Sequence, residues 1–405
     1  AYWVLGRTKF QGYVSARRDV DVRNEHLERD AVDRVAQYRV EAPARHEAAH
    51  AAEALAGMPV LGRNRVDLLI DGHATFDSIV AGIDDAQDYI LFQFFIVKDD
   101  GLGRRIQEHL IARANAGVAV YFIYDEVGSH GLPTRYLDEL RAAGVRVSEF
   151  NTRKGRGNRF QINFRNHRKV VVVDGKYGWI GGHNVGDEYL GKGEFGHWRD
   201  THVRIEGPAV LKAQVSFCED WAWATGEIPP LDWVPHPASD GSDDAVLIIP
   251  TGPSDELETA SLMFVHAIHS ARHRIWIASP YFVPDEAVMV ALQLAGLRGV
   301  DVRVLIPDNP DHLLVYLAAF SYFDQAGQTG VKFYRYLDGF LHEKAMLIDD
   351  GVATIGTANF DNRSFRLNFE ITAAVSNPTF VAKVERMFET DFESARMMQD
   401  GENER

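Results

Sequence analysis

The chain repeats the same order of elements once, at a spacing of about half its length. In each copy a helical stretch leads to an apolar strand, a second helix and two strands that begin near a Gly-Val pair. The glycines pair as Gly117 with Gly299 and Gly144 with Gly330. Apolar runs of strand length alternate with amphipathic helical stretches, which predicts an α/β fold. A repeat this long predicts two similar βα units related by a pseudo-twofold.

The repeat also divides the chain into parts. A stretch rich in Pro and Asp separates the two copies and is typical of a linker. The segment from Asp19 to Gly57 is rich in Ala, Arg and Glu, so we expect helix there, broken at Pro43 and packed outside the main core. The predicted parts are an N-terminal basic flank and helical segment at 1–57, a first domain at 58–225, a linker at 226–244 and a second domain at 245–405.

Each half carries the same polar motif at the same relative place. The motif is His-x-Lys-x4-Asp, and a Gly-x-x-Asn begins seven residues after its Asp. Residues two apart on a strand share a face, so His and Lys of each copy point together. One such motif is weak evidence, but two copies at matching offsets within a repeat exclude a chance match. The residues are His167, Lys169, Asp174 and Asn184 in the first copy, and His342, Lys344, Asp349 and Asn359 in the second.

Two histidines and two lysines brought together by a pseudo-twofold suit phosphodiester chemistry. A neutral imidazole is a nucleophile near neutral pH and an imidazolium is a general acid, so a facing pair can divide these roles. Two lysines and two asparagines supply positive charge and donors to the non-bridging oxygens of a five-coordinate phosphorus. We therefore expect catalysis that requires neither a cofactor nor a metal ion.

Each half also offers an acid to orient its own histidine. Asp200 and Glu370 occupy matching places in the repeat. A carboxylate on one ring nitrogen fixes the tautomer of an imidazole and makes the other nitrogen more basic. The alternative is that these two acids are ordinary surface or salt-bridge carboxylates.

The duplicated His-x-Lys-x4-Asp motif resembles the signature of the phospholipase D superfamily. From about residue 58 onward the flanks are similar to those of bacterial cardiolipin synthases, notably the stretches that begin at Asn163, Phe195, Ser279 and Gly356. The resemblance implies two phospholipase D-type βα sandwich domains related by a pseudo-twofold, with one shared active site and a phosphohistidine intermediate. It further implies transfer of a phosphatidyl group from one phosphatidylglycerol to another, with release of glycerol.

By the same resemblance, His167 is the nucleophile, and His342 acts first as general acid and then as general base. A hydrolytic phospholipase D would use the same residues and let water resolve the intermediate. A phosphodiester nuclease is disfavoured, because the formal charge of −15 lacks the broad basic surface that binds nucleic acid. A catalytically silent lipid-binding scaffold is disfavoured because both motif copies are intact. The exact donor and acceptor lipids and the oligomeric state stay open.

The expected partner is an anionic phospholipid in a membrane. No stretch reaches the roughly 18 apolar residues that a membrane-spanning helix needs. The opening residues Ala1–Arg18 nevertheless combine an aromatic pair with a basic run free of acids, which is typical of the cytoplasmic flank of a membrane helix. We therefore expect a missing anchor upstream, and a catalytic part outside the bilayer on the cytoplasmic side of the bacterial inner membrane. The alternative is a chance basic start.

A basic segment without acids precedes His167 on an otherwise acidic protein. One interpretation is a loop that attracts lipid headgroups beside the catalytic histidine, and the other is a solvated charge run. Its candidate headgroup-binding residues are Arg153, Lys154, Arg156 and Arg159.

Two further patterns compete for a functional interpretation. His46-Glu-x-x-His50 matches the pattern of zinc proteases but lies outside the repeat, so we expect a solvated helix face and no metal site. The apolar stretch Leu313–Phe323 could be a lipid-facing helix, but an apolar helix this short is more often core.

Overall fold

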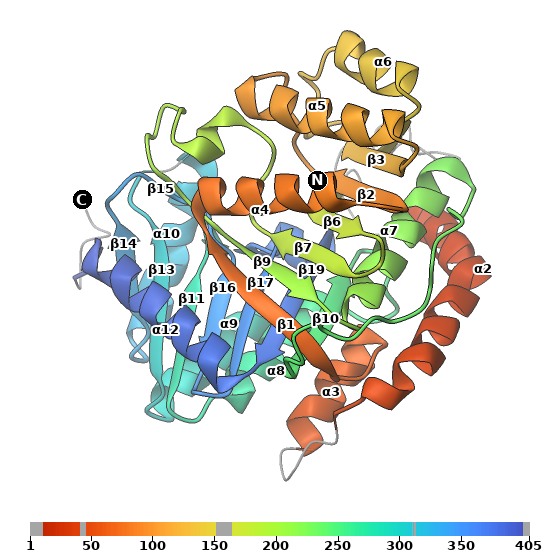
Figure 1. Cartoon of the computed structure of the whole chain (residues 1–405). Helices are drawn as coiled ribbons and strands as arrows, with labels where there is room; N and C mark the ends of the chain where they lie inside the picture. The colour runs from red at the N-terminus through yellow and green to blue at the C-terminus, as the bar shows by residue number, and fades with distance from the viewer. Residues whose placement is uncertain (1–10, 41–45, 151–163, 310, 312, 400–405) are drawn as a thin grey trace.

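The structure is a computed structural model and describes residues 11–40, 46–150, 164–309, 311 and 313–399. One long sheet runs through the molecule and contains strands from both halves (Figure 1). The strands of the first half are β1 (Leu61–Ile70), β2 (Tyr89–Phe94), β3 (Ala119–Asp125), β4 (Arg146–Phe150), β6 (Val170–Val173), β7 (Tyr177–Gly181) and β9 (Thr201–Glu206). Those of the second half are β10 (Asp244–Thr251), β11 (Arg274–Ala278), β13 (Asp301–Pro307), β14 (Lys332–Tyr336), β16 (Ala345–Ile348), β17 (Val352–Gly356) and β19 (Asn368–Ser376), with β20 (Ala395–Met397) at the edge.

The two halves meet where β1 and β10 pair in antiparallel fashion, with Leu61 opposite Val246. Outward from this joint the first half runs β1-β9-β7-β6-β2-β3-β4 and the second runs β10-β19-β17-β16-β11-β13-β14. The pairs β2·β3 and β11·β13 are parallel, and both β6 and β16 are antiparallel to the strand that follows them in the chain. Each strand in one order therefore has its counterpart in the other, and β20 adds one further strand beyond β14. The predicted α/β fold, with two similar units related by a pseudo-twofold, is confirmed.

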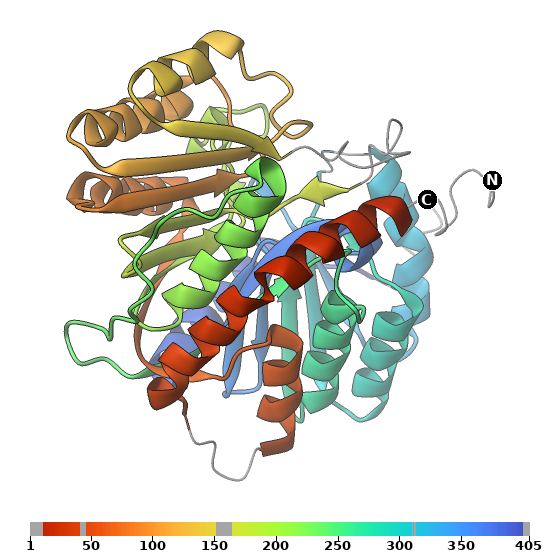
Figure 2. The ribbon, with the colours of Figure 1, turned by 90° about the vertical axis from the view of Figure 1, so that its right-hand side faces the viewer.

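Helices cover both faces of this sheet (Figures 1 and 2). The first unit contributes α4 (Asp71–Asp85), α5 (Gly101–Asn115), α6 (Thr134–Ala142), α7 (Val210–Thr225) and the short η3 (Asp187–Leu190). The second contributes α8 (Thr259–Ser270), α9 (Glu286–Leu297), α10 (Leu313–Gly327), α11 (Asn362–Arg366) and α12 (Pro378–Glu393). The segment that precedes both units forms α2 (Gln11–Val35), η2 (Ala36–Tyr38) and α3 (His46–Ala56). Among the described residues there are also five short strands: β5 (Arg165–Asn166), β8 (Trp198–Arg199), β12 (Phe282–Val283), β15 (Phe340–Leu341) and β18 (Phe360–Asp361).

The prediction that the N-terminal helical segment packs outside the main core is wrong. Helix α2 lies along α7 (Figure 2), and α3 packs against α8. Ala31, Val35 and Ala56 are fully or almost fully buried in the principal core. Leu27, Ala31 and Val35 recur every four residues and form one apolar stripe, which the high content of Arg and Glu in the same helix obscured.

Within the described ranges, no helix is both long enough and apolar enough to span a bilayer. Helix α10 buries Ala319 and Phe323, while Leu317 is 54% exposed. One side of this helix therefore belongs to the core, as expected for a short apolar helix.

Candidate active site

The backbone beside each motif histidine is held by the other half of the chain. Strand β5, just before His167, pairs with β19, and β15, just before His342, pairs with β8. The amide of His167 donates to the carbonyl of Phe369 at 2.9 Å, and the amide of His342 donates to the carbonyl of Arg199 at 2.8 Å. These crossed pairings bring both motif copies into one shared site.

The carboxylates cross over in the same way. Nδ1 of His167 lies 2.9 Å from Oε2 of Glu370, and Nδ1 of His342 lies 2.6 Å from Oδ2 of Asp200. The expectation that each acid orients the histidine of its own half is therefore wrong in its pairing. Glu370 lies on β19 and Asp200 directly follows β8, the two strands that pair with the opposite motif, so each acid reaches across the pseudo-twofold. Both acids are fully buried, which excludes the surface-carboxylate alternative.

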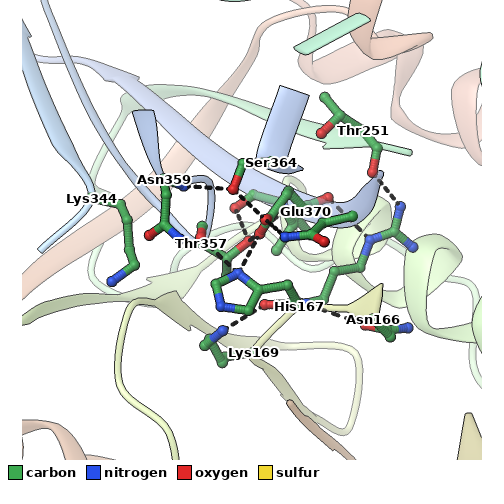
Figure 3. A network of polar contacts seen from close by, with 12 residues as sticks. Asn166, His167, Lys169, Thr251, Lys344, Thr357, Asn359, Ser364 and Glu370 are labelled. Carbon is green, nitrogen blue, oxygen red and sulfur yellow. Dashed lines mark hydrogen bonds and ion pairs between the residues drawn. The ribbon is translucent and has the colours of Figure 1, made fainter. Parts of the chain in front are cut away.

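Glu370 sits among hydrogen-bond donors (Figure 3). Besides His167, its carboxylate accepts from Oγ1 of Thr357 at 2.6 Å, Oγ of Ser364 at 2.8 Å and Nδ2 of Asn368 at 3.0 Å. Burial acts to raise the pKa of Glu370, but the contact with His167, the charge of Lys169 and the hydroxyl of Thr357 outweigh it and hold the pKa below its usual value. Glu370 is therefore an ionised carboxylate.

Asp200 has fewer partners. Its side chain accepts from the amide of Thr201 at 2.8 Å in addition to contacting His342. Burial raises the pKa of Asp200, whereas burial and the charges of Lys344 and Lys169 lower the pKa of His342 well below its ordinary value. At 2.6 Å, the protonation of Asp200 is coupled to that of His342.

The space around Asp200 explains this difference between the two acids. Gly182 holds the place in the first half that Thr357 holds in the second, because each is the second residue of its Gly-x-x-Asn. A Cβ at Gly182 would lie 2.0 Å from Oδ1 of Asp200. No hydroxyl donor can therefore stand at this position beside Asp200.

Both motif lysines are buried and point back at the motif backbone. Nζ of Lys169 donates to the carbonyl of His167 at 2.7 Å, and Nζ of Lys344 donates to the carbonyl of His342. Burial lowers the pKa of Lys169 to about 7 and that of Lys344 to about 8. Figure 3 shows the imidazole of His167 with Lys169 on one side and Lys344 and Asn359 of the second half on the other. A bound anion would favour the charged form of both lysines, which suits them to a phosphate group.

The two asparagines differ. Nδ2 of Asn184 donates to the hydroxyl of Tyr189 at 2.6 Å, and its Oδ1 accepts from the amide of Ile96 at 3.1 Å. Oδ1 of Asn359 is buried without a hydrogen-bond partner. Asn184 thus keeps one N–H for a ligand, whereas the side-chain oxygen of Asn359 is unused.

Asp174 and Asp349, which were predicted to be catalytic, hold the backbone at a distance from the two histidines. In each copy the motif lysine directly precedes a four-residue strand, and the aspartate directly follows it. The strand separates the two residues, because it rises about 3.3 Å per residue. Both have positive φ, 53° and 47°. Their carboxylates accept three successive backbone amides at the start of the neighbouring strand, and so tie two strands together. The donors are Gln87, Asp88 and Tyr89 for Asp174, and Arg272, His273 and Arg274 for Asp349.

We expect Asp349→Ala to destabilise the fold without impairing the chemistry. The variant leaves three backbone amides without their acceptor, which should lower the free energy of unfolding by about 2–4 kcal/mol. Turnover per folded molecule should stay within about threefold of the unmodified protein, because Asp349 does not face the histidines. Denaturant unfolding and kcat measured at low temperature check both values. The matched control is the neighbouring Asp350→Ala, whose side chain is 91% exposed. If Asp349→Ala lost turnover by orders of magnitude at unchanged stability, Asp349 would be a catalytic residue after all.

The sequence analysis also singled out a set of headgroup-binding residues and a zinc-protease pattern. Arg153, Lys154, Arg156 and Arg159 fall outside the described residues, as does the basic start of the chain. On α3, His50 is exposed. In the part of the chain that the structure describes, no three His, Cys, Asp or Glu side chains are grouped to hold a metal ion.

Sequence reasoning missed several residues that shape the site. Thr357, Ser364 and Asn368 hold Glu370, and their signal was the difference between the two copies of Gly-x-x-Asn and its flank. The ring of Phe95 lies edge-on to His167, with centroids 4.9 Å apart, and 5.4 Å from Nζ of Lys169. No local pattern marks Phe95, because it lies at the end of an apolar strand.

Comparison with known proteins places this geometry in a family. The family model described as "Cardiolipin synthase, PLD-like domain" matches residues 79–221 and 264–392. Cardiolipin synthase A of Pseudomonas putida strain GB-1 is 51% identical over 405 residues, which cover 98% of this chain and 83% of that protein. Cardiolipin synthase A of Pseudomonas aeruginosa strain LESB58 is 50% identical over 396 residues, which cover 96% of this chain and 80% of that protein.

Solved structures agree on the fold. The phosphatidylserine synthase of Haemophilus influenzae Rd KW20 matches with a TM-score of 0.68 at 15% identity, over 87% of this chain and 92% of that one. The polyphosphate kinase of Porphyromonas gingivalis matches with a TM-score of 0.58 at 14% identity, over 83% of this chain and 48% of that one. With the fold, the crossed histidine site and the near-complete relatives in agreement, the chain belongs to the cardiolipin synthase family of the phospholipase D superfamily.

Proposed function

We propose that this phosphatidyltransferase moves a phosphatidyl group from one phosphatidylglycerol to another and releases glycerol, through a phosphohistidine intermediate. The observation that carries the proposal is the pair of crossed histidine–carboxylate contacts around two buried lysines. Such a site supplies a nucleophile, a proton donor and a positive environment for a phosphodiester.

In the first step Nε2 of His167 attacks the phosphorus of one phosphatidylglycerol. The bond between phosphorus and the glycerol oxygen breaks, and His342 gives its proton to that oxygen. Four side chains bind the non-bridging oxygens as the phosphorus becomes five-coordinate: Lys169, Lys344, Asn184 and Asn359. In the second step a hydroxyl of the second phosphatidylglycerol attacks the phosphohistidine, His342 takes the hydroxyl proton, and the bond between nitrogen and phosphorus breaks. The proton given in the first step is thus recovered in the second.

The different states of the two acids support this division of roles. Ionised Glu370 accepts from Nδ1 of His167 and leaves Nε2 with a free lone pair, as a nucleophile needs. The raised pKa of Asp200 favours a proton on the pair of Asp200 and His342, from which His342 can protonate a leaving group. Under the pseudo-twofold alone the two histidines would be interchangeable, and the extra donors around Glu370 remove that equivalence.

Incubation with phosphatidylglycerol vesicles tests the proposal. Cardiolipin and glycerol in equal amounts are the expected products, and EDTA should leave the rate unchanged. Phosphatidic acid as the main product would instead indicate a hydrolytic phospholipase D, which needs the same residues. An absence of lipid turnover would overturn both functions.

A phospholipid substrate places the reaction at a lipid surface. We propose that the catalytic part works on the cytoplasmic side of the bacterial inner membrane, with the units 58–225 and 245–405 joined by the linker 226–244 around one site. Lipid headgroups would be attracted by Arg153, Lys154, Arg156 and Arg159, because the protein as a whole is acidic.

A further inference from the structure

A buried polar network lies behind His167. Its centre is Asp220 on α7, which is fully buried. Oδ2 of Asp220 accepts from Nε2 of Gln93 at 2.7 Å, from Nδ2 of Asn166 at 2.7 Å and from Nη1 of Arg168 at 2.9 Å. Asn166 and Arg168 are the two chain neighbours of His167. One carboxylate therefore holds the backbone on both sides of the nucleophile.

Helix α2 supplies a second cation to this carboxylate. Arg17 is 1% exposed, and its Nη1 lies 3.1 Å from Oδ1 of Asp220. Nε of Arg17 donates to Asp21 on the same helix at 2.8 Å. Its guanidinium also lies 4.8 Å from the ring centroid of Phe369, the residue before Glu370. A single side chain from the N-terminal helix thus touches the supports of both His167 and its orienting acid.

The pseudo-twofold shows that Arg17 is an addition to the network around His167. Around His342 the bridging guanidinium belongs to Arg199, the residue before the orienting acid Asp200. Arg199 binds Asp391 on α12 through two hydrogen bonds of 2.8 Å, and lies 3.2 Å from Glu343, the residue after His342. Around His167 the position that corresponds to Arg199 is Phe369, which has no charge. One guanidinium around His167 is that of Arg168, and α2 adds a second, that of Arg17, from outside the repeat.

We propose that Arg17 is a positioning residue, supplied by α2 to hold Asp220, Asn166 and Arg168 so that His167 keeps its line of attack. The N-terminal helix is then part of the active-site structure and not an appended flank. The proposal rests on the role of His167 in the proposed function. Without Arg17, Oδ1 of Asp220 would be a buried carboxylate oxygen without its cation, and the residues bound to Oδ2 would shift to compensate.

The test compares Arg17→Ala and Arg17→Lys with the control Arg29→Ala, whose side chain is exposed on α2 beside Glu25. We measure kcat, KM, the pH profile of kcat/KM and the unfolding temperature. Arg17→Ala should lower kcat by about a hundredfold, since small displacements of a reacting group cost this much, while KM changes by less than about threefold. It should also move the acid limb of the profile to higher pH, because removing a cation makes His167 easier to protonate.

Arg17→Lys keeps the charge but not the planar fork, so it should keep the acid limb in place and lose about tenfold in kcat. Arg29→Ala should match the unmodified protein. The proposal is overturned if Arg17→Ala lowers only the unfolding temperature, with kcat per folded molecule and the acid limb unchanged. If that variant does not fold, a wild-type kcat for Arg17→Lys overturns it. The rate measured is that of whichever product the unmodified protein forms. The test therefore remains valid if the acceptor is water and not a second phosphatidylglycerol.

Discussion

Replacing His167 with Ala is expected to lower the rate of cardiolipin formation by about four orders of magnitude or more, because the nucleophile of the covalent step is lost. His342→Ala should cause a loss of similar size, because neither the leaving glycerol nor the attacking hydroxyl then exchanges a proton. Both side chains are buried among partners from the other half, so neither half should work alone. His50→Ala, at an exposed histidine on α3, is the control and should retain full activity.

The two histidine variants also separate the roles. His342→Ala should still accumulate a phosphatidyl adduct on His167 when the substrate carries a leaving group that needs no proton. Mass spectrometry of rapidly quenched enzyme identifies the modified residue. An adduct on His342 in the His167→Ala variant would reverse the assignment of roles, and substantial turnover by either variant would contradict a shared site.

The second large effect is expected for Glu370→Gln, which should lower kcat by about a thousandfold. An amide at this position no longer stabilises the charge that develops on His167, although its shape is retained. Removing the carboxylate should also lower the pKa of His167, so the acid limb of kcat/KM should move to lower pH. The pH profile of the purified variant measures this shift.

Asp200→Asn and Thr357→Val are the matched comparisons. Asp200 contacts His342, so Asp200→Asn should change the limb of the pH profile that reports proton donation by His342. It should leave the acid limb, which reports His167, in place. Thr357→Val removes one donor to Glu370, which should cost about tenfold or less. If Asp200→Asn shifted the acid limb and Glu370→Gln did not, the crossed pairing would not be the arrangement that operates in turnover.

The chemistry of the site was predictable because it lies in short local patterns. Two copies of His-x-Lys identify His167, Lys169, His342 and Lys344, and the repeat requires a pseudo-twofold. The two motifs were expected on strands, but each lies in the short connection directly before one, β6 or β16. Strands such as β11 and β16 coincide with apolar runs of strand length bounded by polar residues, a pattern that is visible in the sequence. Asp174 and Asp349 share the motif by spacing alone, and local spacing cannot tell a residue that faces the site from one that ends the strand.

What only the tertiary structure decided depends on contacts between distant parts of the chain. Pairing of Asp200 with His167 or with His342 fits the sequence equally well, and the pairing of β8 with β15 and of β5 with β19 selects the crossed arrangement. The same holds for Arg17, whose burial against Asp220 joins residues some two hundred positions apart. By itself, the sequence determined which groups perform the chemistry and that they come in two copies. The packing of the two halves and of α2 decided which acid serves which histidine, because hydrogen-bond partners are chosen by proximity in space.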